Sequence, residues 1–536
     1  MAINTTLLAI LSLGSACLLH FMYRLFTHRR WFKDLPQPPH DFLWGHLKIM
    51  GEVAATMPPN THPQAYLTAI AQKYKLKGIF YIDLWPIAVP QVVLTDPDLM
   101  SRVTINQPLQ MHQMADEFLS PIVGHNVIAV ANGSIWKKAH NAMAPAFSKS
   151  HIRSLTDVIV EETMQFRRAL DQHAGKGDVF SMEDTAARLI FDVIGRILFN
   201  LKLHAQTEGS ALLGDLREMI HLAQAQLSYN PFVKIGLIFK RREVLSRLNP
   251  AIVGIIKERL SILRDQKTVP SRKNPYSILD LMLREHTLDE DQMNEKSENL
   301  TPEFLELLVT NMKGLLLGGH GTTTDTLCFI YMLLSKHPEA VQKLREEHNR
   351  VFHANFAETL DTLLDSPQKT SELEYTTAVI KETLRLFPVG FGVRKAEPGV
   401  TIDYEGKTYP IDNNLVVIPL PHAVHYCPSY YPDPTSFRPE RFLSSDPDST
   451  AANANFRTFG RGARACLGQN LAMTELAIIL LMTIRDYEFD CANLKPNKEP
   501  RTRWTNMDLR FGDVVFQELG LEAKPRGGMM MTVKKV

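Results

Sequence analysis

Cys466 carries the clearest chemical signal in this chain. It lies in the segment Phe459-Gly460-Arg461-Gly462-Ala463-Arg464-Ala465-Cys466-Leu467-Gly468. Glycines at positions 462 and 468 let the backbone turn tightly and bring N–H groups close to the sulfur. Such donors stabilise a thiolate without protonating it. A lone cysteine is usually a small buried hydrophobe, but here four residue types stand at fixed offsets around one sulfur. The pattern indicates a thiolate that binds a metal, with the positive end of a helix expected at 470–479 facing it.

The segment 459–468 has the form Phe-x-x-Gly-x-Arg-x-Cys-x-Gly and resembles the haem-thiolate monooxygenases, the cytochrome P-450 superfamily. The resemblance covers roughly residues 35–525 and implies a mainly α fold with a minor β-sheet region. It also implies that Cys466 is the axial ligand of the iron of haem b. By the same resemblance, Arg464 meets a carboxylate of the cofactor and Phe459 packs beside its ring.

The longest expected helix, residues 301–333, contains in its middle the motif Gly318-Gly319-His320-Gly321-Thr322-Thr323-Thr324. Each glycine costs a helix about 1 kcal/mol against alanine, and close approach of a flat cofactor to a locally opened helix would compensate for that cost. The resemblance makes Thr322 the catalytic residue that handles dioxygen and relays protons. The family usually has an acid at the preceding position, where this chain has Gly321. His320 is then either a substitute for that acid or a packed or outward-facing histidine.

Two charged residues three apart, Glu382 and Arg385, lie on one face of an expected helix and can pair. An exposed pair of this kind contributes very little to stability. The later segment Phe437-Arg438-Pro439-Glu440-Arg441-Phe442 adds a third charge. By resemblance, Glu382, Arg385 and Arg441 form a structural cluster beneath the haem.

Three further residues are candidates for binding the carboxylates of haem. Trp136 has an N–H donor and a ring that can pack on the macrocycle. His140, four residues later, stands where the family usually has an arginine. Arg394 follows the turn at 389–393 and is the second candidate partner. The basic residues of a possible docking patch for a reductase are Lys137, Lys138, Arg457 and Arg461.

The first residues of the chain are apolar from Ile3 to Tyr23. A helix of ~20 such residues spans a bilayer core. The basic residues that follow place the rest of the chain in the cytosol, whereas a cleaved signal peptide would carry them on the other flank. We expect a membrane anchor at 1–30, a proline-rich hinge at 31–45 and a haem-thiolate monooxygenase domain at 46–536. The expected location is the endoplasmic reticulum membrane, crossed once, with the catalytic domain facing the cytosol.

Composition agrees with one large globular body. Hydrophobic residues are 45% and charged residues 22% of the chain, and the formal net charge of +1 gives no reason to expect nucleic acid. Five cysteines without paired spacing predict neither a disulfide framework nor a zinc site. The spacing of apolar residues predicts helices at 65–74, 152–171, 186–199 and 212–227. It predicts strands at 78–84, 91–94, 400–402 and 414–418. The charged and polar segment 289–299 is expected to be a surface loop.

The resemblance predicts an enzyme that oxidises a lipophilic small molecule with dioxygen. Electrons would come from NADPH through a membrane-bound flavoprotein reductase. The sequence is similar to fungal members that act in secondary-metabolite biosynthesis. The segments expected to line the pocket are 111–123, 219–237, 315–317 and 389–393. Two alternatives stay open: a haem-thiolate isomerase, dehydratase or desaturase, and a haem-binding sensor without turnover.

Overall fold

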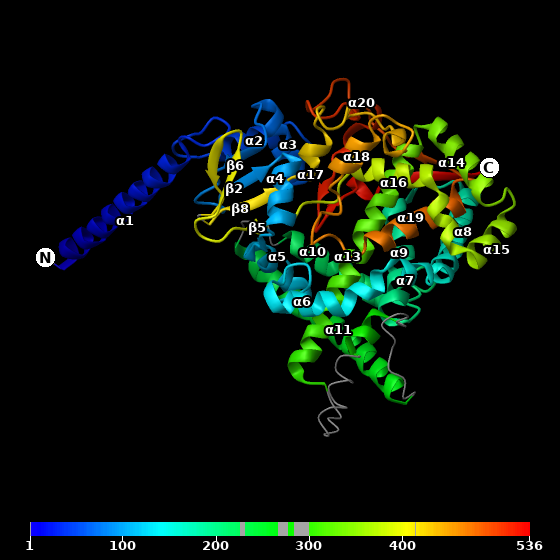
Figure 1. Cartoon of the computed structure of the whole chain (residues 1–536). Coiled ribbons are helices and arrows are strands. Elements are labelled where there is room, and N and C mark those ends of the chain that lie inside the picture. The colour runs from blue at the N-terminus through cyan, green and yellow to red at the C-terminus, as the bar shows by residue number, and fades with distance from the viewer. Residues whose placement is uncertain (1, 226–230, 266–276, 284–299, 413) are drawn as a thin grey trace.

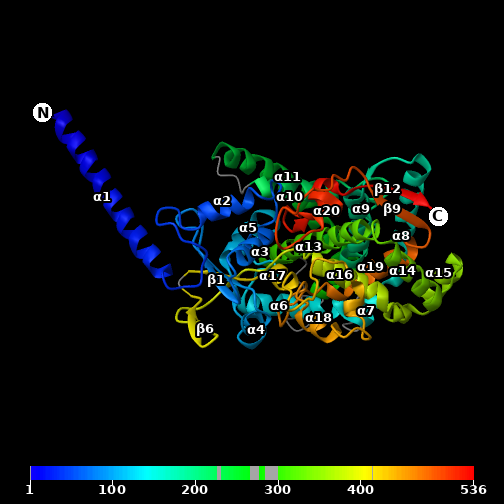
Figure 2. The ribbon, with the colours of Figure 1, turned by 90° about the horizontal axis from the view of Figure 1, so that it is seen from above.

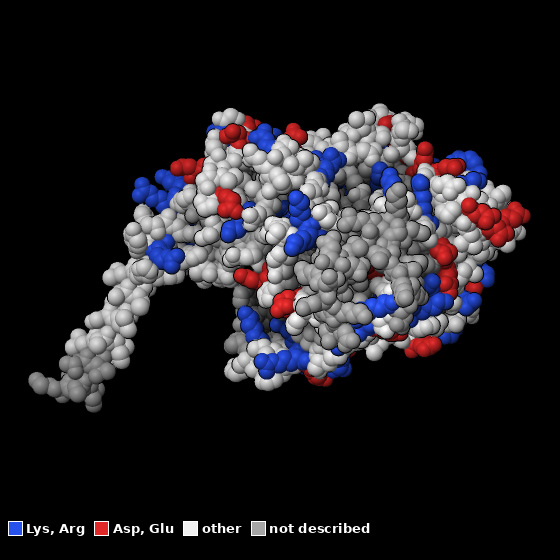
Figure 3. Space-filling view, turned by 60° about the horizontal axis from the view of Figure 1, so that its bottom comes forward, with Lys and Arg blue, Asp and Glu red and all other residues white. Residues whose placement is uncertain are grey.

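A computed structural model describes residues 2–225, 231–265, 277–283, 300–412 and 414–536. The apolar N-terminal segment folds as helix α1 (Ala2–Phe32), which projects away from the body (Figures 1 and 2). Residues Leu7–Phe32 are long and apolar enough to cross a membrane, and their most apolar window is not buried in the protein. Figure 3 shows this helix without charged residues along most of its length, with basic residues where it joins the body.

The last turns of α1 pack against the body. Leu25 and Phe32 are fully buried. Arg29 pairs with the buried Asp83, and its guanidinium also donates to the carbonyl oxygens of Phe42, Leu43 and Trp85. The helix therefore continues past the expected boundary at residue 30, and a buried ion pair fixes its end to the body.

A five-stranded mixed sheet lies beside this junction. Its strands run in the order β1 (Ile79–Ile82), β2 (Gln91–Leu94), β8 (Val416–Pro419), β5 (Arg394–Lys395) and β3 (Gln110–Met111). Strands β2 and β8 are parallel, and the other pairs are antiparallel. The expected strands at 78–84, 91–94 and 414–418 are confirmed here, and the one at 400–402 lies in the hairpin β6–β7 (Thr401–Tyr404, Lys407–Pro410).

Helices form most of the body, as expected for a mainly α fold with a minor sheet region. The central helix is α13 (Pro302–Leu334), which Thr301 caps by accepting from the N–H of Phe304 at 3.2 Å. It packs most extensively against α9 (Met182–Phe199). The helices that complete the surroundings of the site are α6 (Gly133–Met143), α8 (Thr156–Lys176), α16 (Glu374–Leu386) and α19 (Gln469–Thr483).

The remaining helices cover the outside of this core (Figure 1). Their bounds are α2 (Leu47–Ala54), α3 (Pro63–Lys73), α4 (Pro97–Ser101), α5 (Gln113–Val123), α7 (Lys149–Arg153), α10 (Ala211–Ala225), α11 (Pro231–Asp265), α14 (Pro338–Val351), α15 (Phe356–Asp365), α17 (Pro421–His425), α18 (Ser449–Asn455) and α20 (Asp508–Phe511). The other strands form the sheet β4–β12–β9 (Phe180–Ser181, Met530–Lys535, Tyr487–Cys491) and the hairpin β10–β11 (Glu518–Leu519, Ala523–Lys524).

Two expectations need correction. Helix α13 is continuous through its glycines, so the predicted local opening is wrong. At least one of these glycines serves helix packing, since a Cβ on Gly319 would lie 2.8 Å from Ile194 of α9. The helix expected from residue 152 is divided, with α7 ending at Arg153 and α8 beginning at Thr156. The predicted loop 289–299 lies outside the described residues.

Candidate active site

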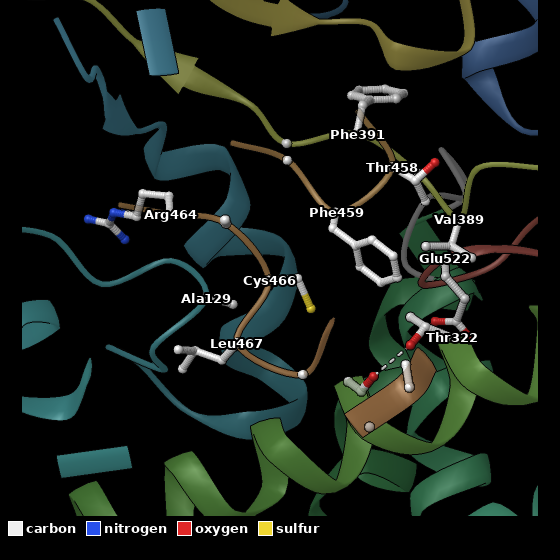
Figure 4. A pocket seen from close by; sticks show the side chains of 18 of the residues that line it. Ala129, Thr322, Val389, Phe391, Thr458, Phe459, Arg464, Cys466, Leu467 and Glu522 are labelled. Atoms are coloured by element: carbon white, nitrogen blue, oxygen red, sulfur yellow. Dashed lines mark hydrogen bonds between the residues drawn. The ribbon is translucent and has the colours of Figure 1, made fainter. Parts of the chain in front are cut away.

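The functional residues surround one cavity of about 610 Å³. Its walls come from the middle of α13, the loop before α19, helix α6, strand β5 and the turn between β10 and β11. Figure 4 shows Cys466 and Phe459 pointing into this space from the loop before α19, and Thr322 from α13. The structure thus brings together residues that lie up to 460 positions apart in the chain, from His62 to Glu522.

The loop before α19 holds the Cys466 sulfur in a fixed position. The N–H of Cys466 donates to the carbonyl of Phe459 at 2.9 Å. Gly462 has a φ of +80°, and a Cβ there would lie 2.2 Å from the carbonyl oxygen of Thr104, so only glycine fits. Burial raises the pKa of the Cys466 thiol, while the N–H groups of Gly468 and the following residue lower it. These are the donors that the sequence pattern predicts around the sulfur.

Arg464 lies at the edge of the cavity beside α6. Its guanidinium donates to the carbonyl of Ala131 at 2.6 Å and to the side chain of Asn132 at 3.1 Å. It also lies 4.4 Å above the ring of Trp136, whose ring is 4.9 Å from that of His140. Trp136, His140 and Arg464 all line the cavity. The side chain of Asn132 also accepts a hydrogen bond from the N–H of Met111 and donates one to its carbonyl oxygen. No motif in the sequence indicated this role for Asn132.

The position of Arg457 shows that the expected docking patch needs correction. Its side chain is only 6% exposed and lines the cavity, where it donates to Ser101 at 3.4 Å. Arg461 also lines the cavity and donates to the carbonyl of Asn453 at 2.9 Å. Lys137 and Lys138 alone are exposed. The four residues therefore do not form one surface patch, because the chain turns the two arginines inward.

The four arginines that line the cavity, Arg394, Arg457, Arg461 and Arg464, have no carboxylate partner within the described part of the chain. Burial lowers the pKa of Arg394, and it lowers those of Arg457 and Arg464 to about 10. Guanidinium groups removed from water need an anionic partner. A ligand with carboxylates on one edge and a metal that accepts a thiolate fits this donor set. The residues present therefore fit haem, and Arg457 joins the residues that sequence patterns indicated.

Thr322 faces the cavity from α13. Its hydroxyl donates to the carbonyl of Gly318 at 2.8 Å, one turn earlier. His320 faces another way, with its ring buried 5.8 Å from that of Phe191 on α9. Burial lowers the pKa of His320 to about 3. Of its two open interpretations, the structure supports the packed histidine.

The remaining lining is largely apolar. Among the described residues, Met111, Leu315 and residues 389–392 line the cavity as expected, whereas 219–225 and 232–237 do not. Two acidic residues without any motif, Glu475 of α19 and Glu522 of the β10–β11 turn, line it as well. Other apolar side chains that line it are Ile128, Ala129, Ile194, Phe147 and Leu521.

The charge cluster lies behind the cavity and is fully buried. Arg385 makes two bonds of 2.8 Å to the two carboxylate oxygens of Glu382, and Arg441 donates to the same carboxylate at 3.1 Å. Arg385 also donates to the carbonyl oxygens of His425 and Pro434. All charges and donors here have partners, so the cluster ties α16 to the segment around Arg441.

A cysteine thiol, four arginines without a carboxylate partner among the described residues and a threonine-bearing helix surround one cavity, as a haem-thiolate protein requires. The Cytochrome P450 family matches residues 36–510. The chain is 30% identical over 508 residues to Cytochrome P450 monooxygenase polC of Polytolypa hystricis, covering 94% of this chain and 90% of the relative. It is 30% identical over 506 residues to Cytochrome P450 monooxygenase acrF of Aspergillus aculeatus (90% and 99% covered), and 24% over 532 residues to Cytochrome P450 3A7 of Homo sapiens (97% and 95%). The chain therefore belongs to the cytochrome P-450 family and is a monooxygenase.

Proposed function

We propose that the protein inserts oxygen into a lipophilic small molecule, with electrons delivered from NADPH by a flavoprotein reductase. The observation that carries the proposal is the presence of Cys466 and Thr322 on one largely apolar cavity. Such a lining favours a lipophilic ligand. The similarity to fungal monooxygenases supports a role in secondary-metabolite biosynthesis. The overall reaction is RH + O2 + 2 e⁻ + 2 H⁺ → ROH + H2O.

Bound haem b would supply the activation of dioxygen, and residues of this chain would hold the cofactor and manage protons. Cys466 would bind the iron through Sγ. Arg394, Arg457 and Arg464 would bind the carboxylates, with Trp136 and His140 beside them. The Thr322 proton is committed to the Gly318 carbonyl, so its oxygen is free to accept a hydrogen bond from a proton donor.

The membrane arrangement follows from α1. The helix would cross the endoplasmic reticulum membrane once, and the basic residues at its end, including Arg29 and Arg30, favour a catalytic body on the cytosolic side. A reductase anchored in the same membrane could then reach this body. Lys137 and Lys138 are exposed on α6 and would contribute to an electrostatic docking surface for an acidic partner.

Replacing Cys466 by alanine tests the proposed iron ligand. The purified wild-type protein should bind one haem, and its reduced carbon-monoxide adduct should show the red-shifted Soret band of a thiolate ligand. Cys466→Ala should abolish that band. The matched control is Cys427→Ala, which removes a half-buried free thiol elsewhere and should keep the band. A thiolate band in Cys466→Ala would refute the assignment.

Oxygen uptake then separates the reaction types. A monooxygenase should consume one dioxygen for each product molecule formed, in the presence of the reductase and NADPH. Product formed without oxygen uptake would indicate an isomerase or dehydratase. Haem binding without any turnover in the presence of extracted host metabolites would indicate a sensor. Comparing the metabolites of a deletion strain with those of its parent would supply the substrate.

A further inference from the structure

Glu522 occupies the space in which a side chain at position 321 would lie. An ideal Cβ on Gly321 would be 2.5 Å from Glu522 Oε1 and 3.1 Å from its Cδ. Glu522 and Thr322 both line the cavity, and Figure 4 shows the two side chains next to each other. Glycine at 321 therefore admits a carboxyl group that arrives from a segment 201 positions later in the chain.

The turn that carries Glu522 is held in place on both sides. Within the turn, the N–H of Gly520 donates to the carbonyl of Glu522 at 2.9 Å. The N–H of Ala523 donates to the carbonyl of Val389 at 2.9 Å, and the carbonyl of Ala523 accepts from Gln517 at 2.7 Å. These bonds fix the backbone on either side of Glu522, so its carboxyl group reaches α13 from a rigid support.

Glu522 lies among charged side chains that act on one another: Glu183 and Lys524 influence the pKa of Glu522, and Glu522 and Glu183 influence that of Asp325. Asp325 lies four residues after Gly321, on the same face of α13. It is 2% exposed, and its Oδ2 has no hydrogen-bond partner among the described residues. Farther out, Glu183 and Lys524 pair at 3.6 Å and are each partly exposed to solvent. We call Glu183, Asp325 and Glu522 the acidic path.

We propose that Glu522 supplies the carboxyl group that the position before Thr322 lacks, and that the acidic path carries protons from the surface to the Thr322 side of the cavity. The inference rests on the proposed monooxygenase function, which consumes two protons per turnover. In each transfer the Glu522 carboxyl O–H gives its proton to an acceptor beside Thr322. The resulting carboxylate is protonated again from Asp325, which takes its proton from solvent by way of Glu183.

Electrostatics of the path agree with proton storage. Burial is the main cause that raises the pKa of Glu522, to about 7, and the charge of Glu183 adds to it while Lys524 lowers it. Burial also raises the pKa of Asp325, with further contributions from Glu522 and Glu183. Two buried carboxyl groups that repel one another cannot both be ionised at low cost. The pair therefore holds a proton at neutral pH, where a carboxyl exposed to water would have lost it.

The contact with Gly321 can be tested through stability alone. Gly321→Ala should give a lower thermal midpoint than the helix propensity of alanine alone predicts, because its Cβ displaces the Glu522 carboxyl, and adding Glu522→Ala should remove that penalty. The matched control is Gly214→Ala in α10, where a Cβ meets nothing within 4 Å. Removing glycine there should leave the midpoint unchanged or raised. If the effects of Gly321→Ala and Glu522→Ala simply add, the two residues are not in contact and the proposal fails.

Proton storage is measured by infrared spectroscopy of the resting protein. All proteins compared carry Glu475→Gln, which removes the other buried carboxyl of the cavity, whose pKa burial raises to about 8. In that background, a protonated carboxyl band that titrates near pH 7 should be present when Glu522 is intact and in the exposed control Glu499→Gln, and absent in Glu522→Gln. If Glu522→Gln keeps the band, Glu522 does not hold the proton and the proposal is overturned. This readout does not depend on turnover, so it is independent of the proposed function.

Proton delivery is measured by incubating the protein with the reductase and NADPH and determining how much of the reduced oxygen appears as water and how much as peroxide. This assay needs no known substrate. Glu522→Gln should lower the fraction of oxygen reduced to water about tenfold or more. In the wild type this fraction should fall as pH rises through 7, and in Glu522→Gln that pH dependence should be absent. Glu522→Asp should restore part of the water formation. The double variant Gly321→Asp with Glu522→Ala should also recover water formation, because it places a carboxyl in the vacated space. Unchanged water formation and pH profile in Glu522→Gln would refute the proposal, even if the thiolate band showed that the haem site is intact.

Discussion

At the scale of single residues, carboxyl groups without a countercharge determine how the site responds to pH. Glu475 is the clearest example outside the acidic path. It faces the cavity from α19, is 1% exposed, and its Oε1 has no hydrogen-bond partner among the described residues. Burial raises its pKa to about 8. Leaving such a group ionised in the interior costs free energy, so the folded protein keeps it protonated well above the pH at which the unfolded chain releases the proton.

We predict that Glu475→Gln stabilises the protein more at pH 8 than at pH 5. Between the ordinary value of 4.5 and about 8, the folded wild type binds more protons at this site than the unfolded chain. Its stability must therefore fall as pH rises through this window. The Glu475→Gln variant has no such dependence at this site. Its unfolding free energy relative to the wild type should therefore grow by on the order of 2–4 kcal/mol between pH 5 and pH 8. Urea unfolding at both pH values measures it, and an equal difference at the two would contradict the assignment.

Residues with a local motif could be predicted from the sequence, and those without one could not. Cys466 and Arg464 stand at fixed offsets in one short segment, and they do line one cavity. Glu522 and Glu475 have no such signature, because their roles depend on contacts between distant segments. Arg457 was assigned to the surface by its charge alone, and its burial shows that charge without neighbours is a weak guide to exposure.

At the scale of elements, the buried charge cluster joins α16 to the segment around Arg441, which precedes α18. The Glu382 carboxylate accepts from Arg385, from Arg441 and from the backbone N–H of Arg438 at 3.0 Å. Since all of these side chains except Arg438 are fully buried, their charges are weakly screened. The pairing of Glu382 and Arg385 was expected from helical spacing, but spacing could not show that the pair is buried. Likewise, the glycines of α13 were identified, whereas their packing partners were not.

Glu382→Ala should be strongly destabilising. It leaves two buried guanidinium groups without their carboxylate, and breaking a buried pair by removing one partner costs about 3–5 kcal/mol. The matched control is Glu374→Ala in the first turn of the same helix, where the side chain is exposed. The control should change stability by no more than about 0.5 kcal/mol. Thermal unfolding and haem content measure both variants. Equal stability of the two would show that the cluster does not hold α16 in place.

At the scale of the whole molecule, α1 has two parts with different environments. Its first part projects from the body (Figure 2), whereas its last turns are packed against the sheet region. The apolar run itself was predictable because a membrane span needs only length and composition. The attachment was not, since it depends on Asp83, a residue 54 positions after its partner Arg29. The two histidines His28 and His40 also contact this carboxylate, each at 3.0 Å.

Two truncations should separate membrane anchoring from folding. Deleting residues 2–20 removes most of the exposed apolar helix but keeps Leu25 and Arg29, so the protein should move to the soluble fraction with nearly unchanged stability. Deleting residues 2–32 also leaves the buried Asp83 without its arginine, and the thermal midpoint should fall clearly. Fractionation and thermal unfolding measure the two effects.

A third variant, Asp83→Asn in the full-length chain, is the control for the ion pair. It should lower stability, as the longer deletion does, while the protein stays with the membrane, because the apolar helix is intact. If both truncated proteins remained membrane-bound, another apolar surface would have to contact lipid. The exposed Phe232, Ile235 and Phe239 of α11 would be the first residues to replace. If the two truncations were equally stable, the buried ion pair would not be what fixes α1 to the body.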